Sequence, residues 1–347
     1  MGLSPELLKS LQEMGFEQPT PIQDKTIPYI MESSNDLVAL AQTGTGKTAA
    51  FGIPVLQQIN LENDDIQSIV LCPTRELCLQ ITSDIEKLSK FVPVSTVAVY
   101  GGEPIQKQLS ALKKGCQIVV GTPGRMNDLI NRNKLNLSKI RFLVLDEADE
   151  MLKMGFKEEM DAILAQTPAM KQTLLFSATM PADIANMAGR YMNTPKKISV
   201  TAQNKTADNI DHRYMVTSPA TTYQALRRYA DLHPDIYSLV FCRTRQETKD
   251  IAEKLIADGY NADAIHGDLS QAQRDQVMGR FRKKHLQLLI ATDVAARGLD
   301  VTELTHVIHY HIPDDPENYV HRSGRTGRAG KSGISMAIIT PGEQRKI

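Results

Sequence analysis

The stretch AQTGTGKT, residues 41–48, decides how the first half of this chain folds. The apolar run DLVAL (36–40) precedes it and predicts a buried strand, whereas AAFGIPVLQQI (49–59) follows it and favours a helix that begins at Lys47. A strand, a glycine-containing turn and a helix N-terminus together direct backbone N–H groups at a polyphosphate. The stretch therefore predicts a phosphate-binding loop within an α/β sheet.

Within this loop, Lys47 can reach the β- and γ-phosphates of a nucleoside triphosphate, and the Thr48 hydroxyl can bind Mg²⁺. The usual first glycine of the G-x-x-x-x-G-K-[ST] pattern is Ala41 here, which weakens the bare motif. The strand before the loop and the helix after it still support the prediction.

A loop of this kind needs a carboxylate partner at the end of a neighbouring buried strand. IRFLVLDEAD (140–149) supplies Asp146 for the Mg²⁺ shell and Glu147 to accept a proton from the attacking water. Acidic residues also favour helix N-termini, which explains many Asp-Glu pairs. Because helix capping does not explain why the pair follows an apolar strand, we predict a catalytic role.

A cation is also needed for the negative charge that builds on the γ-phosphate. HRSGRTGR (321–328) offers Arg322, Arg325 and Arg328, the last two about one helical turn apart. Arginines in such positions raise hydrolysis rates by roughly 10³- to 10⁵-fold. The alternative is that this segment is only a basic surface loop.

Composition sets limits on the class of protein. The 347 residues suffice for two domains of about 150 to 200 residues each. The 40 basic and 40 acidic residues cancel, so any nucleic-acid binding must be local, and the basic run RFRKKH (280–285) is equally typical of a solvated helix end. No segment has the roughly 20 apolar residues of a membrane helix, and MGLSPELLKS (1–10) is not a secretion signal, so we expect a soluble, cytoplasmic protein with no membrane partner.

The cysteines indicate no cross-link. Cys72, Cys78, Cys116 and Cys242 contain no C-x-x-C pair, and three of them lie in strand-like runs. We expect reduced, buried thiols and neither a disulfide framework nor a zinc site.

Short β-branched runs alternate with helical stretches along the whole chain, which predicts parallel α/β sheets with helices on both faces. The polar segment TAQNKTADN (201–209) has no apolar period and predicts a flexible linker between domains at 1–200 and 210–347. The runs that predict strands are DLVAL, SIVLC, VSTVAVY, CQIVVG, RFLVLDE, QTLLFSAT and KKISV, then HRYMV, SLVFC, ADAIHG, LQLLIAT, THVIHYH and GISMAII.

The two halves also repeat each other. SIVLCPTRE from Ser68 aligns with SLVFCRTRQ from Ser238, and the same offset of 170 residues aligns QIVVGT from Gln117 with QLLIAT from Gln287. One offset at two separate strands favours a duplicated domain, although any two parallel sheets share some apolar similarity. Ligands of such sheets bind beyond the carboxyl ends of the strands.

Taken in order, these motifs resemble those of the DEAD-box RNA helicases of superfamily 2 over nearly the whole chain. The resemblance implies two tandem RecA-like domains, RNA-stimulated hydrolysis of ATP with Mg²⁺, and local unwinding of short RNA duplexes. The motifs that carry it are GFEQPTPIQ (15–23), AQTGTGKT (41–48), PTREL (73–77), GG (101–102), TPGR (122–125), DEAD (146–149), SAT (177–179), VFCRTR (240–245), TDVAARGLD (292–300) and HRSGRTGR (321–328).

The resemblance also implies roles for single residues around the nucleotide. Gln23 would read the adenine edge with Phe16 and Thr20 nearby, Asp300 would touch the ribose, and Arg325 and Arg328 would face the γ-phosphate. Ordinary structural duties, such as helix starts and caps, are the competing interpretation. The loop positions expected to bind ATP are Ala41, Gln42, Thr43, Gly44, Thr45, Gly46, Lys47 and Thr48, and those expected to link the domains are Asp149, Ser177, Thr179 and His321.

RNA contacts implied by the family fall on loops after strands. Their residue types suit phosphate and sugar oxygens rather than base edges, so little sequence specificity is expected. Discrimination against DNA would depend on the 2′-hydroxyl and the strand shape. The positions are Pro73, Thr74, Arg75, Gly101, Gly102, Thr122, Pro123, Gly124 and Arg125 in the first half, and Thr244, Arg245, Arg274 and Thr292 in the second.

The chain departs from the family at both ends. An aromatic residue that stacks on adenine usually lies upstream of GFEQPTPIQ, before Met1 of this sequence, so a reduced ATP affinity is expected. PGEQRKI (341–347) stops within what looks like a starting helix, so we expect a truncated, monomeric core.

The implied mechanism is a clamp that ATP and RNA close together, in which each ligand strengthens the binding of the other. The helix after TPGR, expected at 126–131, would bend the bound strand, and hydrolysis would reopen the clamp. Two alternatives stay open: an ATP-latched RNA clamp that does not unwind, and a DNA-directed ATPase of superfamily 2.

Overall fold

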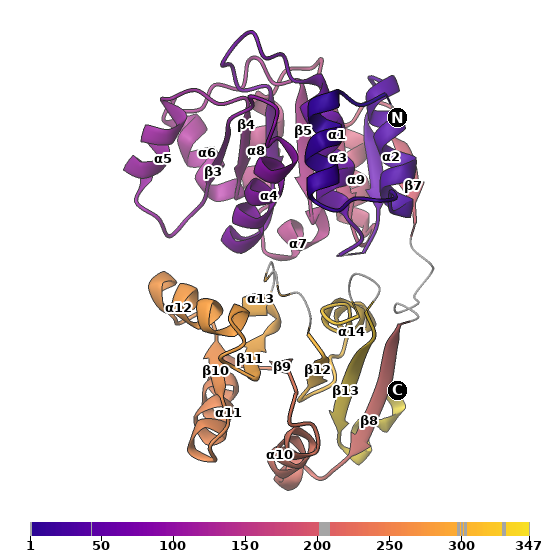
Figure 1. Ribbon diagram of the computed structural model, residues 1–347, viewed down its shortest axis with the longest axis vertical. Coiled ribbons are helices and arrows are strands. Elements are labelled where there is room, and N and C mark those ends of the chain that lie inside the picture. Colours follow the sequence, from indigo (N-terminus) through magenta and orange to yellow (C-terminus); the bar gives the residue numbers. More distant parts are fainter. Residues whose placement is uncertain are drawn as a thin grey trace. The chain divides into compact units, whose positions relative to one another are not determined.

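The computed structural model describes residues 2–42, 44–200, 209–296, 299, 301, 304–327 and 331–346. The chain divides into two units, Met1–Thr201 and Ala202–Ile347, each built on a parallel β-sheet (Figure 1). The predicted fold class, two parallel α/β domains, is confirmed. Of the predicted linker 201–209, only Asn209 lies within the described residues. No helix in the described ranges is long and apolar enough to span a bilayer.

In the described part of the first unit, seven parallel strands form a sheet in the order β3-β4-β2-β5-β6-β1-β7. The strands are β1 (Leu37–Leu40), β2 (Ser68–Leu71), β3 (Thr96–Val99), β4 (Ile118–Gly121), β5 (Phe142–Asp146), β6 (Gln172–Ser177) and β7 (Lys196–Ser199). The helices are α1 (Pro5–Glu13), α2 (Pro21–Glu32), α3 (Lys47–Gln58), α4 (Arg75–Leu88), α5 (Ile105–Leu112), α6 (Pro123–Asn131), α7 (Ala148–Lys153), α8 (Lys157–Gln166) and α9 (Ala182–Tyr191).

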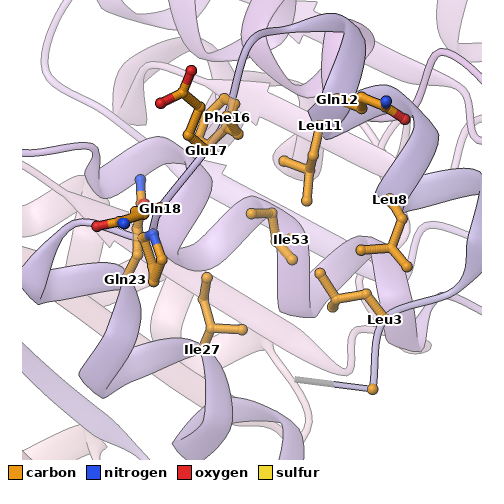
Figure 2. A pocket seen from close by; sticks show the side chains of 12 residues that line it. Leu3, Leu8, Leu11, Gln12, Phe16, Glu17, Gln18, Gln23, Ile27 and Ile53 are labelled. Carbon is orange, nitrogen blue, oxygen red and sulfur yellow. The ribbon is translucent and has the colours of Figure 1, made fainter.

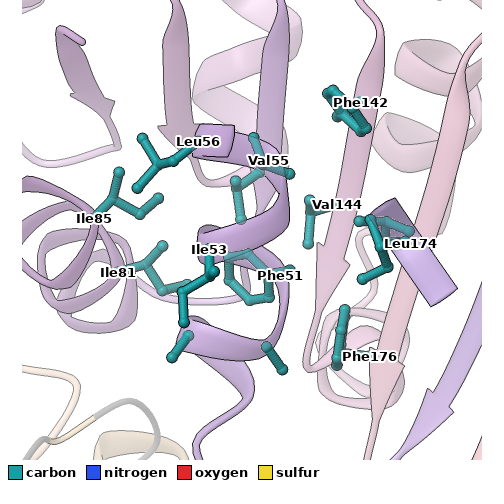
Figure 3. Close-up of a cluster of buried hydrophobic side chains, with 14 of the residues drawn as sticks. Phe51, Ile53, Val55, Leu56, Ile81, Ile85, Phe142, Val144, Leu174 and Phe176 are labelled. Atoms are coloured by element: carbon teal, nitrogen blue, oxygen red, sulfur yellow. The ribbon is translucent and has the colours of Figure 1, made fainter. Parts of the chain in front are cut away.

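Two apolar layers cover the faces of this sheet. Helices α1 to α4 pack on one face and α5 to α9 on the other, because successive strand residues point to opposite faces. Val144 of β5 belongs to the first layer, whereas Leu143 and Leu145 belong to the second. Figure 3 shows the first layer, where α3 lies between α4 and the strands, and the rings of Phe51 and Phe176 stand 5.4 Å apart.

The second unit contains a six-stranded parallel sheet among its described residues, in the order β10-β11-β9-β12-β13-β8. Its strands are β8 (Ile210–Val216), β9 (Ser238–Cys242), β10 (Ala262–Ile265), β11 (Leu288–Thr292), β12 (His306–His309) and β13 (Gly333–Ile339). Helices α10 (Thr222–Leu232) and α11 (Arg245–Ala257) cover one face, and α12 (Gln271–Arg282), α13 (Asp293–Ala296) and α14 (Pro316–Ser323) cover the other. Short 3₁₀ helices occupy Pro219–Thr221 and Pro341–Lys346, and the second lies where the sequence predicted the start of a helix.

The internal repeat extends from sequence to topology. Strands β1 to β6 of the first sheet occupy the same places, in the same chain order, as β8 to β13 of the second. The pairing register is shared as well. Ser68 pairs with Ile118 in the first sheet, and the residues 170 positions later, Ser238 and Leu288, pair with each other in the second. The ends of β2 and β9, and those of β4 and β11, are therefore equivalent positions in the two units.

Each cysteine is buried and free, as expected from the sequence. Burial raises the pKa of the Cys116 thiol to about 11 and that of Cys242 well above its ordinary value. The Cys116 and Cys242 thiols are therefore protonated, unreactive parts of the core.

Gly121, the last residue of β4, lies where no side chain fits. A Cβ atom there would approach Val99 Cγ2 to 2.6 Å and the Val99 carbonyl oxygen to 2.8 Å. We expect Gly121→Ala to lower the free energy of unfolding of the first unit by about 1–3 kcal/mol, as overpacking does. The matched control is Gly189→Ala in the exposed part of α9, where a Cβ meets nothing within 4 Å and helix propensity favours alanine by up to about 1 kcal/mol. Urea-unfolding midpoints followed by circular dichroism compare the two, and equal effects would contradict this account.

Candidate active site

The predicted phosphate-binding loop connects β1 to α3, and α3 begins at Lys47 as expected. Gly44 and Gly46 have φ angles of 83° and 88°, in the left-handed region that favours glycine. Ala41 needs no such freedom, because it is fully buried and its N–H continues the sheet by donating to the Ser177 carbonyl at 2.9 Å. The missing first glycine of the motif therefore does not disturb the loop. Thr43 lies outside the described residues.

The start of α2 holds this loop from outside. The Thr20 hydroxyl donates to the Thr45 carbonyl at 2.8 Å, and Gln23 Nε2 donates to the Gly46 carbonyl at 3.1 Å. Gln23 Oε1 accepts from the Thr20 N–H at 2.9 Å, which completes a capping box at the start of α2. Gln23 thus binds the loop backbone, a contact that the sequence did not predict. Its amide retains one N–H and one lone pair, so adenine recognition stays a prediction.

Beside Gln23 lies a pocket of about 610 Å³ (Figure 2). Leu8 and Leu11 of α1, Ile27 of α2 and Ile53 of α3 line it, and Phe16 and Gln23 also belong to its lining. Three amide side chains, those of Gln12, Gln18 and Gln23, and the Glu17 carboxylate complete the lining, and an apolar wall with a few polar groups is the usual composition of a small-molecule pocket.

Lys47 and Asp146 form a buried pair beneath the loop. Lys47 Nζ lies 3.7 Å from Asp146 Oδ1, and the residues are 6% and 3% exposed. Burial raises the pKa of Asp146 to about 6, even though the Lys47 charge opposes the shift. Lys47 Nζ has no hydrogen-bond partner among the described residues. A buried ammonium without a partner is costly, so the pair suits a site that an anion and a cation complete. Thr48 follows on the first turn of α3 and is partly buried.

Glu147 directly follows this pair in a strained conformation. Its φ of 52° is left-handed, which is uncommon outside glycine, and its N–H donates to Asp146 Oδ1 at 3.0 Å. Glu147 occupies the N-cap position of α7, yet its side chain makes no capping hydrogen bond. Helix capping therefore does not account for the glutamate, and strain of this kind is common at functional sites.

The residues expected to link the domains lie in both units. Asp149 Oδ2 accepts from the N–H and the hydroxyl of Thr179, at 3.1 and 2.8 Å, which ties α7 to the segment after β6. The Ser177 hydroxyl is buried and has no hydrogen-bond partner within the described ranges. His321 lies on α14 of the second unit.

Two arginines of the first unit's candidate RNA loops share one support. Arg125 donates to Gln108 Oε1 at 2.8 Å and to the Glu103 carbonyl at 3.1 Å, while Arg75 lies 3.9 Å from the Glu103 carboxylate. The Arg75 guanidinium also stands 4.8 Å from the centre of the Tyr100 ring. Tyr100, Glu103 and Gln108 were not predicted as supports, because they meet the two arginines only when separate segments of the chain come together in the folded sheet.

The remaining candidate RNA positions of the first unit lie on the same edge of the sheet. Thr74 caps α4 by accepting from the Leu77 N–H at 3.2 Å, and Gly101 and Gly102 are exposed. Helix α6 begins at Pro123, three residues earlier than predicted, because Thr122 stands at its N-cap and proline suits the first helical position. Pro73, Thr122 and Pro123 are buried, whereas Gly124 is partly exposed.

The second unit repeats part of this arrangement. Thr244 caps α11 as Thr74 caps α4, and Arg245 pairs with Asp268 at 2.7 Å on the surface. Thr292 Oγ1 accepts from the Ala295 N–H at 3.3 Å, and Arg274 donates to the Ala295 carbonyl at 3.4 Å. These candidate RNA residues therefore lie near two strand ends of one sheet.

Of the three candidate arginines, the structure describes Arg322 and Arg325. Helix α14 ends at Ser323, and Arg325 lies in the turn that follows, with its Nη1 donating to the Leu299 carbonyl at 3.4 Å. Arg322 is buried and forms an ion pair with Asp293 of the same unit, so its charge is already neutralised there. Arg328 and Asp300 lie outside the described residues.

Comparisons with known proteins show the family of this chain. A family model described as DEAD/DEAH box helicase matches residues 20–187, and one described as helicase conserved C-terminal domain matches 221–330. The DEAD-box ATP-dependent RNA helicase CshA of Geobacillus kaustophilus is 48% identical over 343 residues, which cover 99% of this chain and 73% of that protein. CshA of Bacillus subtilis is 47% identical over 343 residues, covering 99% and 69%.

A solved structure of S. cerevisiae Dbp5 bound to RNA and ADP BeF3 is also similar. The TM-score is 0.89 at 31% identity, and the match covers 98% of this chain and 88% of that one. With both family models matched in order, and with relatives this similar over nearly its whole length, the chain belongs to the DEAD-box helicase family.

Proposed function

We propose that this chain is an ATP-dependent RNA helicase, in which bound RNA stimulates ATP hydrolysis and the cycle separates short RNA duplexes. The observation that carries the proposal is the buried Lys47–Asp146 pair beneath a glycine loop, with Glu147 held beside it. The names of the CshA relatives and the RNA in the Dbp5 complex support the same activity.

In this proposal ATP is the substrate, and Lys47 with the N–H groups of residues 41–48 binds its phosphates. Thr48 and Asp146 would hold Mg²⁺, which keeps few protein ligands and neutralises phosphate charge when bound.

Glu147 is the proposed base for the attacking water, and Asp146 orients it through the hydrogen bond from the Glu147 N–H. Arg325 and Arg328 would stabilise the γ-phosphate charge, and Asp300 would touch the ribose. Closure of the two units on RNA would complete the site, with Asp149, Ser177, Thr179 and His321 between them. Hydrolysis would then reopen the clamp and release the strand.

The RNA is bound by its backbone. Arg75 and Arg125, fixed by Glu103 and Gln108, would grip phosphates in the first unit, and Arg245 with Thr292 would do so in the second. Little sequence preference follows, because base edges are not read. A monomeric core and a cytoplasmic location are further parts of the proposal.

Steady-state phosphate release tests the function directly. The rate should rise with single-stranded RNA and much less with single-stranded DNA of the same sequence, and a short labelled RNA duplex should be separated only with ATP. Stimulation by RNA without duplex separation would favour an ATP-latched clamp, and equal stimulation by DNA would favour a DNA-directed ATPase.

Glu147→Gln removes the proposed base and keeps the size of the side chain. We expect the RNA-stimulated turnover to fall by about 10²- to 10⁴-fold with ATP and RNA binding retained. The control is Glu158→Gln in the exposed first turn of α8, which should leave turnover unchanged. Retained turnover in Glu147→Gln would exclude Glu147 as the base.

Gly46→Ala tests the hold of Gln23 on the loop. A Cβ at Gly46 would lie 2.4 Å from Gln23 Nε2, so the Gln23 amide must shift and its hydrogen bond to the Gly46 carbonyl is disturbed. We expect the Kd of a fluorescent ATP analogue to rise about tenfold or more, an effect of about 1.4 kcal/mol. Gly155→Ala is the matched control, because Gly155 has a similar φ of 86° but no atom within 4 Å of a new Cβ. Equal losses in both variants would show that backbone strain alone is responsible.

A further inference from the structure

Arg322 fixes the end of α14 from which Arg325 follows. Its Nε and Nη2 donate to the two carboxylate oxygens of Asp293 at 2.6 Å each, and its Nη1 donates to the His311 carbonyl at 3.0 Å. The guanidinium stands 5.0 Å from the Phe241 ring centre, and the side chain is 5% exposed. These three hydrogen bonds hold the Arg322 guanidinium in a single orientation. Because the Arg325 N–H donates to the Arg322 carbonyl at 3.0 Å, the position of Arg325 depends on this anchor.

His311 connects the same anchor to the start of α11. Its side-chain Nε2 lies 2.6 Å from Glu247 Oε1, with the two side chains 23% and 27% exposed. Because a carboxylate only accepts, the imidazole donates in this bond. Burial would raise the pKa of Glu247, but the hydrogen bonds from His311 and from the Arg243 N–H hold it below its ordinary value. The bond is therefore charge-assisted and stronger than one between neutral groups.

Glu247 in turn organises the loop that carries candidate RNA contacts. Its Oε2 accepts from the Arg243 N–H at 2.9 Å, and its own N–H donates to Thr244 Oγ1 at 3.1 Å. Thr244 and Arg245 therefore lie on the segment that this glutamate fixes. At the other end of the chain of contacts, Asp293 directly follows Thr292, a second candidate RNA residue.

We propose that Glu247 and His311 are positioning residues that connect RNA bound at the start of α11 with Arg322 and, through it, with Arg325. The proposal rests on the proposed function. In it, RNA on Thr244 and Arg245 fixes the first turn of α11, Glu247 holds His311, and the His311 carbonyl holds Arg322 in place. Neither side chain touches RNA or nucleotide. Loss of the hydrogen bond between His311 and Glu247 should therefore lower stimulated turnover without weakening the binding of either ligand.

The test compares RNA-stimulated kcat, the RNA concentration at half-stimulation and ATP affinity in matched variants of the whole chain. His311→Leu removes the donor and should lower stimulated kcat about tenfold, within the usual range of site-to-site coupling, with the RNA requirement and ATP affinity changed less than twofold. His311→Gln retains an N–H donor and should restore most of the loss. Glu247→Ala keeps the His311 backbone and should repeat the defect if His311→Leu folds poorly. Tyr223→Phe is the control, since it removes another hydrogen bond to a carboxylate in the same unit, from the Tyr223 hydroxyl to Asp258 at 2.6 Å.

The double variant distinguishes a connected pair from two separate residues. His311→Leu combined with Glu247→Ala should be no slower than Glu247→Ala alone, because Glu247→Ala already removes the His311–Glu247 bond, together with the bond from the Arg243 N–H. Additive losses, unchanged kcat, or a raised RNA requirement with kcat retained would each overturn the positioning role. An unsubstituted chain that RNA does not stimulate would overturn the proposed function itself, whereas stimulation that survives in both single variants would overturn only this inference.

Discussion

The buried pair of Lys47 and Asp146 is the interaction on which the candidate site depends. Two opposite charges 3.7 Å apart inside a protein do not recover all the hydration that they lose, and here the ammonium has no hydrogen-bond partner in the described ranges. Burial leaves the Asp146 pKa near 6, so the isolated pair is only partly satisfied. A phosphate for Lys47 and a cation for Asp146 would supply the missing partners. The parallel sheet creates this situation, because it brings the ends of β1 and β5 to one edge.

The surrounding contacts keep that edge in a defined shape before any ligand binds. Thr20 and Gln23 hold the glycine loop from α2, Asp149 holds Thr179, and the Arg75 and Arg125 side chains converge on Glu103. Each of these bonds joins segments that are far apart in sequence. A site with this much support loses little conformational freedom when it binds, which favours affinity.

Local patterns in the sequence predicted most of the fold. Each apolar run became a strand, α3 begins at Lys47, and the offset of 170 residues anticipated both the shared strand order and the shared register. These features follow from patterns of neighbouring residues and from the internal repeat, which can both be recognised in the sequence. The early start of α6, the turn at Arg325, the hold of Gln23 on Gly46 and the pairing of Arg322 with Asp293 were not predicted. They depend on caps, or on contacts between side chains whose partners only the folded sheet brings together.

The duplicated topology also shows what one copy has lost. Leu71 pairs with Leu145 in the first sheet and Phe241 with His309 in the second, so Tyr310 and His311 occupy the places of Asp146 and Glu147. After β8, the counterpart of β1, residues 217–221 read TSPAT, without glycine or lysine. The C-terminal copy keeps the strand-end threonines and arginines, but at these equivalent described positions it has neither a glycine loop with a lysine nor an acidic pair. We therefore expect a stoichiometry of one bound nucleotide for every two units.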